Sequence, residues 1–527
     1  MRVPVTINQI FGGLASTEYL GEDGSFVAAT AIDPDYPAVS SRVKSSGLLV
    51  PIGYADFSST NVNDEAIALI TNPKNTLTYA VLSNGKLISY SSALTAASET
   101  LIGTVTGSKA HGAAYYNNYI YIFGTGASEN DVSRYGPLDN APSLANGVWT
   151  GATLGSQTAL VDTTYPSLRS VEMPNHWAFA HGDNALYFLD FKNGQGLVHK
   201  IITSKTTDEG DTNNGSAYNS LDLPFGFYPT SLTNVSTNLF ITGIYTTDTT
   251  VQQGKAAFVV WDPTDTTSFH TGPIALPDTL VTASLTKNGE VYFWGGNSQN
   301  GVTLYRYLGG ESYEPLAELE EGLPPFAGAV DTHRNRVVWG GFTTNPTSYS
   351  CVWAYGSKNA KLPKGIQNIA KTAAAGATPT VSALKYVLQS SYIQPQLVIA
   401  WNDASDSGID KYSATATLAA NMRFMVNIGQ KFEIKKIRIP LAGAVNSTTT
   451  ITPLIYLDDF SSNPTDALPV INNTNYPSKR KVLYRGTQLR GYVGENNFVL
   501  DLTWTNTNPL AVALPIRIDV EVKNDEA

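Results

Sequence analysis

The sequence has little of what cross-links or activates many other proteins. Its 527 residues include one cysteine, Cys351. A single thiol excludes an intrachain disulfide framework and a zinc site built from cysteines. Because Cys351 lies in the apolar run YSCVWAY, we expect a buried structural thiol rather than a nucleophile.

Long apolar runs are also missing. No stretch reaches the ~18 consecutive apolar residues that a membrane-spanning helix needs. The opening MRVPVTINQIFGG has one arginine and no apolar core of the kind found in secretory signals. We therefore expect no membrane span and a protein made in a cytoplasm rather than secreted by a signal peptide.

Charge is sparse and unevenly placed. Charged residues make up 15% of the chain, and the net charge is −10. From Thr415 onward there are 12 Lys and Arg against 10 Asp and Glu, so the first 414 residues have 22 against 34. An acidic surface of this kind disfavours nucleic acid as the main partner of the larger part.

Turn-forming and aromatic residues are abundant instead. The chain has 44 Gly, 28 Pro and 28 Tyr, with 42% hydrophobic residues. This composition indicates an all-β protein with many turns and argues against disorder.

Short apolar strands recur along the chain and often end in glycine. The series is TLTYAVLSNG, YIYIFGTG, ALYFLDF, NLFITGIY, VYFWGGN, RVVWGGF and QLVIAWND. A second strand, most often aromatic, follows each of them, and a small apolar strand precedes most of them. Seven such units of roughly 50 residues fit between Glu65 and Ala414, which is the period of β-propeller blades. We predict about seven blades, with six to eight allowed.

The unit VYFWGGNSQNGVTLYRYLGGESYEPLAELEEGLP, residues 291–324, resembles a degenerate kelch repeat. It has a double glycine after an apolar strand, then an aromatic strand and an exit that ends in proline. The resemblance implies a kelch-like propeller. Trp294 and Trp339, 45 residues apart, are then expected at equivalent places in consecutive blades.

Two regions lie outside the period. Residues 1–60 are predicted to be extended, and either close the ring by adding a strand to the last blade or project as an arm. Residues 61–414 form the predicted propeller. Residues 415–527 contain alternating strands such as KFEIKKIRIP and predict a β-sandwich, jelly-roll-like.

Catalytic and metal-binding patterns are weak. His176 and His181 are five apart on an expected strand, so they point to opposite faces. Asp331, Asp403 and Asp406 are candidate glycosidase carboxylates, but no spacing ties two of them together. The oxygen-rich segments 208–216 and 402–410 do not match a calcium-binding loop. We predict no catalytic, cofactor or metal residues, no cofactor, and a protein that is not an enzyme.

Some side chains are candidates for contact with a partner. Aromatic residues in expected turns are Tyr228, Phe269 and Tyr313. Basic residues cluster in KFEIKKIRIP and in SKRKVLYRGTQLR, where Lys479, Arg480 and Lys481 stand together. These cations either face solvent or meet an acidic partner, including the acidic propeller of a neighbouring subunit.

The opening VTINQIFGGLASTEYLGEDGSFVAATAIDPDYPAVSSRVKSSG resembles tailed-phage structural proteins of the nozzle, hub or fibre type that are built on a propeller. The resemblance implies a virion protein of the tail or tail tip. It would act by assembly and by host contact, as a homo-oligomer with other virion proteins as partners. The host contact would be a surface glycan or receptor.

Two other functions stay open. One is a propeller that binds or cleaves carbohydrate and carries an accessory sandwich. The other is a kelch-like intracellular scaffold.

Overall fold

The computed structural model describes most of the chain. The described residues are 2–7, 13–14, 25–26, 28–30, 32, 48–49, 53–72, 77–105, 109–116, 118–125, 131–138, 143–145, 178–181, 185–192, 195–202, 216–245, 254–263, 269–297, 301–319, 322–343, 349–356, 365–374, 379–388, 395–403, 405–413, 420–458, 466–489, 491–505 and 510–523.

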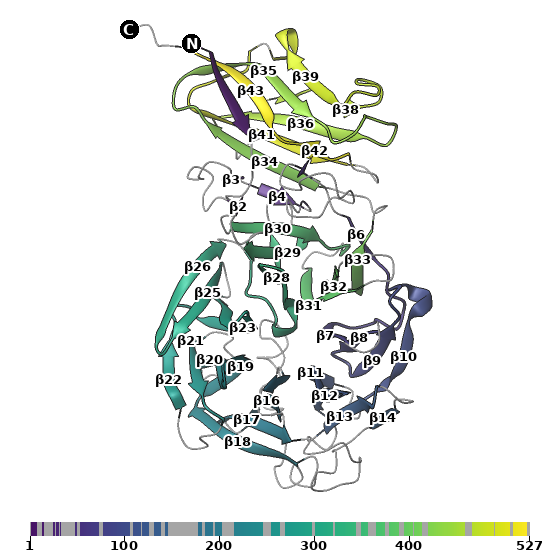
Figure 1. Ribbon diagram of the computed structural model, residues 1–527, viewed down its shortest axis with the longest axis vertical. Helices are drawn as coiled ribbons and strands as arrows, with labels where there is room; N and C mark the ends of the chain where they lie inside the picture. Colours follow the sequence, from purple (N-terminus) through teal and green to yellow (C-terminus); the bar gives the residue numbers. More distant parts are fainter. Residues whose placement is uncertain are drawn as a thin grey trace.

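Seven four-stranded antiparallel sheets stand around a ring, which confirms the predicted propeller (Figure 1). Blade 1 contains β7 (Ala66–Thr71), β8 (Thr78–Leu82), β9 (Lys86–Tyr90) and β10 (Thr100–Thr104). Blade 2 contains β11 (Lys109–Tyr116), β12 (Tyr119–Thr125), β13 (Asp131–Gly136) and β14 (Ser143–Ala145). Blade 3 contains β15 (Ala178–His181), β16 (Ala185–Lys192), β17 (Gln195–Ile202) and β18 (Ser216–Phe225). Blades 4 and 5 are β19 (Phe227–Val235), β20 (Asn238–Tyr245), β21 (Lys255–Trp261), β22 (Phe269–Ala275); β23 (Leu280–Lys287), β24 (Glu290–Gly296), β25 (Val302–Gly309), β26 (Ser312–Leu319). Blades 6 and 7 are β27 (Val330–His333), β28 (Arg336–Thr343), β29 (Tyr349–Gly356), β30 (Gly365–Lys371); β31 (Thr380–Val387), β32 (Gln396–Asn402), β33 (Ser407–Tyr412), β6 (Tyr54–Asp56).

The second strand of every blade is one of the seven recurring apolar runs. The first strands of neighbouring blades contact one another and so lie toward the centre of the ring. Many side chains of these first strands are small, as expected, but not all of them are apolar. Between β19 and β23, Thr230 donates to the Val281 carbonyl at 2.6 Å, and the hydroxyls of Ser231 and Ser284 lie 2.9 Å apart. Hydroxyls thus satisfy one another where the blades crowd together.

Apolar clusters fill the spaces between adjacent blades. One cluster joins blades 5 and 6 and contains both tryptophans of the Trp-Gly-Gly runs. Trp294 of β24 and Trp339 of β28 are almost fully buried, with ring centroids 5.8 Å apart. Both lie in the second strand of their blade. The predicted register is therefore confirmed for these two blades.

The ring closes through the N-terminal segment. β6 pairs antiparallel with β33, so Tyr54 lies opposite Tyr412 and Asp56 opposite Asp410. Blade 7 is thus built from strands more than 350 residues apart. Because β6 precedes blade 1 in the sequence and completes blade 7, it ties the last blade to the first. The ring is thereby closed without an unpaired strand edge between them.

Two further sheets follow the ring and share one hydrophobic core. The first contains β1 (Arg2–Ile7), β43 (Ile516–Val522), β35 (Phe432–Pro440), β39 (Lys481–Arg485) and β40 (Val493–Gly494). The second contains β37 (Asp466–Ala467), β36 (Thr450–Leu457), β41 (Asn497–Trp504), β34 (Ala420–Asn427), β4 (Ala28–Thr30) and β38 (Ile471–Asn472). Alternating burial along β34 and β35 gives each sheet one inner and one outer face. We call this part the two-sheet domain; its jelly-roll-like connectivity stays a prediction.

Short elements complete the described chain. β2 (Gly13–Leu14) pairs with β3 (Ser25–Phe26), and β5 (Leu48–Leu49) pairs with β42 (Val512–Ala513). The 3-10 helices are η2 (Ala96–Ser98), η4 (Ala327–Ala329) and η5 (Gly486–Leu489).

The N-terminal segment closes the ring, one of the two alternatives predicted for residues 1–60, and it also adds strands to the two-sheet domain. β1 pairs with β43 in one sheet of the two-sheet domain, and β4 pairs with β34 in the other. β6 then completes blade 7. The same segment therefore serves both parts, because each part has a free sheet edge to which it can add a strand.

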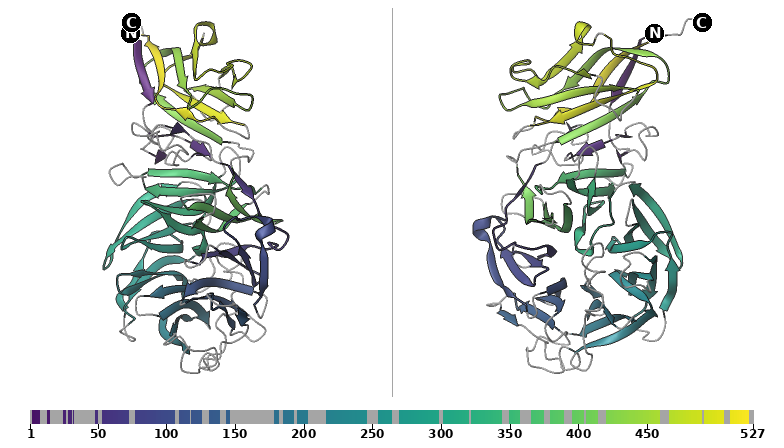
Figure 2. Two further views of the ribbon diagram at one scale, coloured as in Figure 1. Left: turned by 45° about the vertical axis from the view of Figure 1, so that its right-hand side comes forward. Right: turned by 180° about the vertical axis from the view of Figure 1, so that it is seen from behind.

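The two-sheet domain lies beside the rim of the ring, next to β30 (Figures 1 and 2). β2 and β4 of the N-terminal segment contact β30, the outermost strand of blade 6. The N-terminal segment thus lies at the junction between the two parts. The two-sheet domain stands beside the rim and does not cover either flat face of the ring in these views.

Candidate functional site

A polar pocket lies where the ring closes, between blades 7 and 1. Its volume is about 400 Å³, and its lining is Thr60, Val62, Asn63, Asp64, Asn402, Ser405, Asp406 and Ser407. Residues 60–64 belong to the connection from β6 to β7, and residues 402–407 to the turn between β32 and β33. Ring closure therefore brings together two oxygen-rich segments that are far apart in the sequence. We call this site the seam pocket.

In each of the two carboxylates of the seam pocket, one oxygen accepts a hydrogen bond from a backbone N–H. Asp64 accepts the Glu65 N–H at 2.8 Å, and Asp406 accepts the Ser407 N–H at 2.9 Å. Lys86 lies nearby, but its Nζ donates to the Asn63 side-chain oxygen at 2.9 Å rather than to a carboxylate. The pocket thus presents carboxylate oxygens, amides and hydroxyls, which suit cations and hydrogen-bond donors.

Two of the candidate glycosidase carboxylates have structural roles. Asp403 is buried and accepts the Ser405 and Asp406 N–H groups at 3.2 and 2.8 Å, which fixes the β32–β33 turn. Asp331 on β27 forms an ion pair with Lys385 at 3.0 Å and accepts the Tyr386 N–H at 2.8 Å. Of the three, only Asp406 lines the seam pocket.

Two carboxyl groups near the closure have strongly raised pKa values. Burial, followed by the neighbouring Asp64 carboxylate, raises the pKa of Glu65 to about 7. Burial also raises the pKa of Asp410 to about 7, against hydrogen bonds from the Ala373 N–H and the Trp401 indole. Neither group could be recognised from the sequence, because the side chains become buried only in the folded ring.

Glu99 on the rim of blade 1 behaves in the opposite way. Burial opposes ionisation there, but hydrogen bonds from the Ser59 hydroxyl and N–H and from the Tyr90 hydroxyl outweigh it and lower the pKa of Glu99. Ser59 lies in the connection that follows β6. Glu99 therefore anchors that connection to blade 1.

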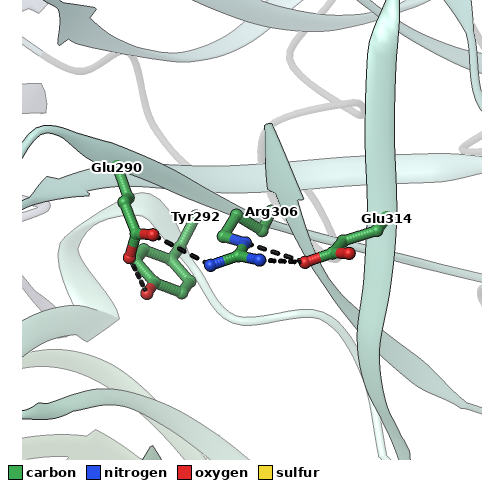
Figure 3. Close-up of polar contacts among 4 residues, drawn as sticks. All are labelled: Glu290, Tyr292, Arg306 and Glu314. Atoms are coloured by element: carbon green, nitrogen blue, oxygen red, sulfur yellow. Dashed lines mark hydrogen bonds and ion pairs between the residues drawn. The ribbon is translucent and has the colours of Figure 1, made fainter. Parts of the chain in front are cut away.

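A second pair of carboxylates lies on blade 5, where Arg306 separates them (Figure 3). The Arg306 guanidinium donates to Glu314 and to Glu290, each at 2.8 Å. Tyr292 donates its hydroxyl to the other oxygen of Glu290 at 2.6 Å. The register places Arg306 opposite both Tyr292 and Glu314. This cluster ties three strands together and leaves no pair of free carboxylates for acid–base chemistry.

The three aromatic contact candidates pack within the blades. Tyr228 is 1% exposed on β19. Phe269 on β22 packs against the apolar cluster between blades 3 and 4. Tyr313 on β26 lies edge-on to Phe258 and Tyr305. Tyr228 precedes a proline in a segment interpreted as a turn, but it belongs to an inner strand. It is not available for contact with a partner in this structure.

In the first basic cluster the lysines are paired with acidic side chains, whereas Arg438 forms no ion pair among the described residues. Lys435 pairs with Glu433 at 2.6 Å and with Glu521 at 3.1 Å, and Lys436 pairs with Asp519 at 3.1 Å. Lys479, Arg480 and Lys481 are exposed, as expected of contact residues. In the described part of the chain these three form no ion pair.

The other chemical candidates add no site. Cys351 is fully buried on β29, as predicted. His176 and residues 208–215 lie outside the described residues, and His333 stacks on Tyr386 with centroids 4.2 Å apart. Among the described residues there is no group of three or more His, Cys, Asp or Glu placed to hold a metal ion. The same residues contain no helix long and apolar enough to cross a membrane.

Comparisons with known proteins found solved structures that are similar to this chain at low identity. No family model and no curated protein matches the chain. The β-propeller domain of Cps50 (Swd1) from Myceliophteria thermophila is similar to it at 7% identity and a TM-score of 0.42, covering 69% of this chain and 100% of that one. The computationally designed protein Ika8 is 14% identical with a TM-score of 0.36, over 68% of this chain and 99% of its own. The C-terminal WD40 domain of Sif2 is 10% identical with a TM-score of 0.38, over 66% and 81%. The seven four-stranded sheets themselves define the chain as an all-β protein with a β-propeller.

Proposed function

We propose that this protein is a structural component of a tailed-phage virion, located in the tail or tail tip, and that it acts by assembly rather than by catalysis. The observation that carries the proposal is the path of the N-terminal segment. Its strands complete both sheets of the two-sheet domain and the last blade of the ring. A force applied to either part is passed to the other through hydrogen-bonded strands, which suits a part of a mechanical assembly.

The chemistry of the candidate residues supports a role without catalysis. Asp403 and Asp331 are held by backbone N–H groups, and Arg306 neutralises Glu290 and Glu314. A retaining or inverting glycosidase needs two carboxyl groups that face the same bond, one of them able to donate a proton. None of these four carboxylates is free for that task.

The resemblance of residues 5–47 to tailed-phage tail proteins supplies the biological setting, with other virion proteins as partners and the virion as the location. Purified phage particles test the proposal. The chain should copurify with particles at a constant ratio to the major tail proteins through successive gradients, and antibodies against the ring should label the tail. Particles of constant infectivity that lack the chain would exclude this role.

A glycan-binding propeller is the second candidate, and the seam pocket favours it. Carboxylates, amides and hydroxyls such as those of Asp406, Asn63 and Ser405 are the groups that bind sugar hydroxyls. Binding to a broad glycan array tests this function. The double variant Asp406→Asn and Ser405→Ala should then lose the glycan while keeping its fold, because both residues are exposed. If no glycan binds to the wild-type chain, the second candidate fails.

A further inference from the structure

The outer face of the five-stranded sheet in the two-sheet domain is divided by charge. At the end near β40, every lysine has an acidic partner: Lys431 with Glu495, Lys435 with Glu433 and Glu521, Lys436 with Asp519, and Lys523 with Glu433. The strand register places Arg438 beside Arg517 on the same face, one row further along. In the described part of the chain, the cations at that end form no ion pair.

We call these unpaired cations the basic edge. They belong to β35, β39, β43 and the connection before β39, and they are Arg438, Lys479, Arg480, Lys481, Arg485 and Arg517. None of the six forms an ion pair within the described residues. All but Arg438 are exposed, and the Nε of Arg438 is buried with no acceptor among the described residues. A cluster of cations without acidic neighbours suits an anionic partner.

The basic edge is held in place by backbone hydrogen bonds. The Lys479 carbonyl accepts the Val445 N–H at 2.8 Å, and the Arg480 carbonyl accepts the Leu441 N–H at 3.0 Å. β39 pairs with β35 on one side and is the edge strand of its sheet among the described strands. Because the backbone is fixed before any partner arrives, little ordering entropy is lost on binding. Figure 1 shows β39 on the side of its domain away from the ring.

The chain itself carries a surface of opposite charge. The first 414 residues have 12 more acidic than basic side chains. In the seam pocket, Asp64 and Asp406 each use one carboxylate oxygen for a backbone N–H, and neither forms an ion pair in the part of the chain that the structure describes. The pocket of about 400 Å³ is concave and large enough for the end of an Arg or Lys side chain.

We propose that the basic edge binds the seam pocket of a second copy of this chain, with a basic side chain entering the pocket between Asp64 and Asp406. This inference rests on the proposed assembly role and names its contact. The two surfaces differ, so the contact is heterologous, and repetition gives a closed ring or a filament of copies. Opposite charges steer the encounter and make the association weaken as salt rises.

Sedimentation velocity of the full chain tests the contact. At low ionic strength the wild type should associate, and salt should reverse the association. Reversal of three charges, Lys479→Glu, Arg480→Glu and Lys481→Glu, should weaken association at least about tenfold, because close charge pairs across interfaces contribute more than 1.4 kcal/mol. The pocket variant Asp64→Lys with Asp406→Lys should weaken it to a similar extent.

The decisive measurement mixes the two variants. Each variant should stay monomeric alone, but the mixture should associate, since one chain supplies an intact basic edge and the other an intact seam pocket. Thermal unfolding shows that both variants fold. A monomeric wild type at low salt, or a basic-edge variant that associates as the wild type does, overturns the inference. Binding of the wild type to heparin in place of self-association also overturns it.

The proposed virion role is tested separately. Particles can contain the chain even if copies of it do not associate through these surfaces, so the particle experiment and the sedimentation experiment can fail independently. A glycan would compete for the same pocket. Association of purified chains in the absence of any glycan therefore distinguishes the two uses of the seam pocket.

Discussion

Asp56 and Asp410 are register partners across β6 and β33, the strand pair that closes the ring. Asp56 accepts the Ser58 and Ile409 N–H groups at 2.8 and 3.2 Å. Asp410 is fully buried, and the Asp56 carboxylate adds to the burial that raises its pKa. Two acidic side chains thus meet at the point where the ring is joined, and like charges opposite each other destabilise a strand pair.

The pH dependence of folding should report on Asp410. Its pKa rises from 3.8 to about 7 on folding, so the folded state holds the proton more tightly than the unfolded state. The stability from this group is complete below pH ~4 and is lost as the pH rises to about 7. The loss is at most about 4 kcal/mol, since one pKa unit corresponds to ~1.4 kcal/mol.

The variant Asp410→Asn removes this titration. We expect the free energy of unfolding in urea to fall less steeply between pH 5 and 7 than in the wild type, whatever its absolute value. Glu311→Gln, which changes an exposed carboxylate in the β25–β26 turn, is the control and should keep the wild-type slope. An unchanged slope in Asp410→Asn would show that this carboxyl does not titrate in that range.

The glycines of the Trp-Gly-Gly runs should resist substitution for reasons of space. A Cβ added at Gly340 would lie 2.5 Å from the Cβ and Cγ1 of Val381 in the next blade. Gly340→Ala should therefore cost about 1–3 kcal/mol, as overpacking does. Gly272 on β22 has nothing within 4 Å of such a Cβ. Gly272→Ala should leave the urea midpoint nearly unchanged, and equal losses in both variants would disprove the steric argument.

The buried indoles differ in whether their N–H is satisfied. The Nε1 of Trp294 is buried with no acceptor among the residues that the structure describes, whereas the Nε1 of Trp504 donates to the Leu510 carbonyl at 3.1 Å. Replacing Trp504 by Phe leaves a carbonyl without its donor, which costs about 1–3 kcal/mol. Replacing Trp294 by Phe removes an unsatisfied donor. Trp294→Phe should therefore lower the stability of the propeller less than Trp504→Phe lowers the stability of the two-sheet domain. Amide hydrogen exchange measures the stability of the two parts separately. The reverse order would contradict the assignment.

Asp458 should make the two-sheet domain sensitive to acid. Its carboxylate accepts the Glu495, Asn496 and Asn497 N–H groups at 2.6, 2.8 and 3.1 Å. Burial opposes ionisation, but these three bonds outweigh it and lower the pKa of Asp458. The stabilisation is present above pH ~4 and is lost as the pH falls through the lowered value.

Two substitutions separate the charge of Asp458 from its backbone. Asp458 has a positive φ of 57°, which Asn also tolerates. Asp458→Asn should cost about 1–3 kcal/mol at neutral pH and flatten the acid limb of the stability curve. Asp458→Ala should cost more, because alanine adds backbone strain. Equal losses of stability in the two variants would show that the positive φ at residue 458 costs alanine no extra strain.

The repeat pattern made the ring predictable. Each recurring apolar run became the second strand of a blade because one strand must be buried on both faces, and that requirement shows in the sequence. Trp294 and Trp339 could be placed in this way. The seam pocket could not be placed, since it joins Asp64 to Asp406 only through ring closure, and the choice of partner for β6 is a tertiary event.

The contact candidates illustrate the same limit. Lys479, Arg480 and Lys481 were placed correctly on the surface because three adjacent cations cannot all be buried. Tyr228 was not, because its neighbours Gly226 and Pro229 are typical of turns, yet the strand β19 begins at Phe227. The neutralisation of Lys435 and Lys436 depends on Glu521 and Asp519, far along the chain. Sequence spacing carries no information about that pairing.

The pairing of β1 with β43 has a consequence for synthesis. β6 can pair with β33 only after Tyr412 has been translated, and β1 can pair with β43 only after Val522 has been translated. The ring therefore cannot be finished before the first of these points, and the two-sheet domain cannot be finished before the second. Until then the nascent chain exposes an open blade and an incomplete sheet, both of which invite aggregation. A ribosome that stalls early releases a product with neither part complete. Proteolysis would remove such fragments before they could be built into a larger structure.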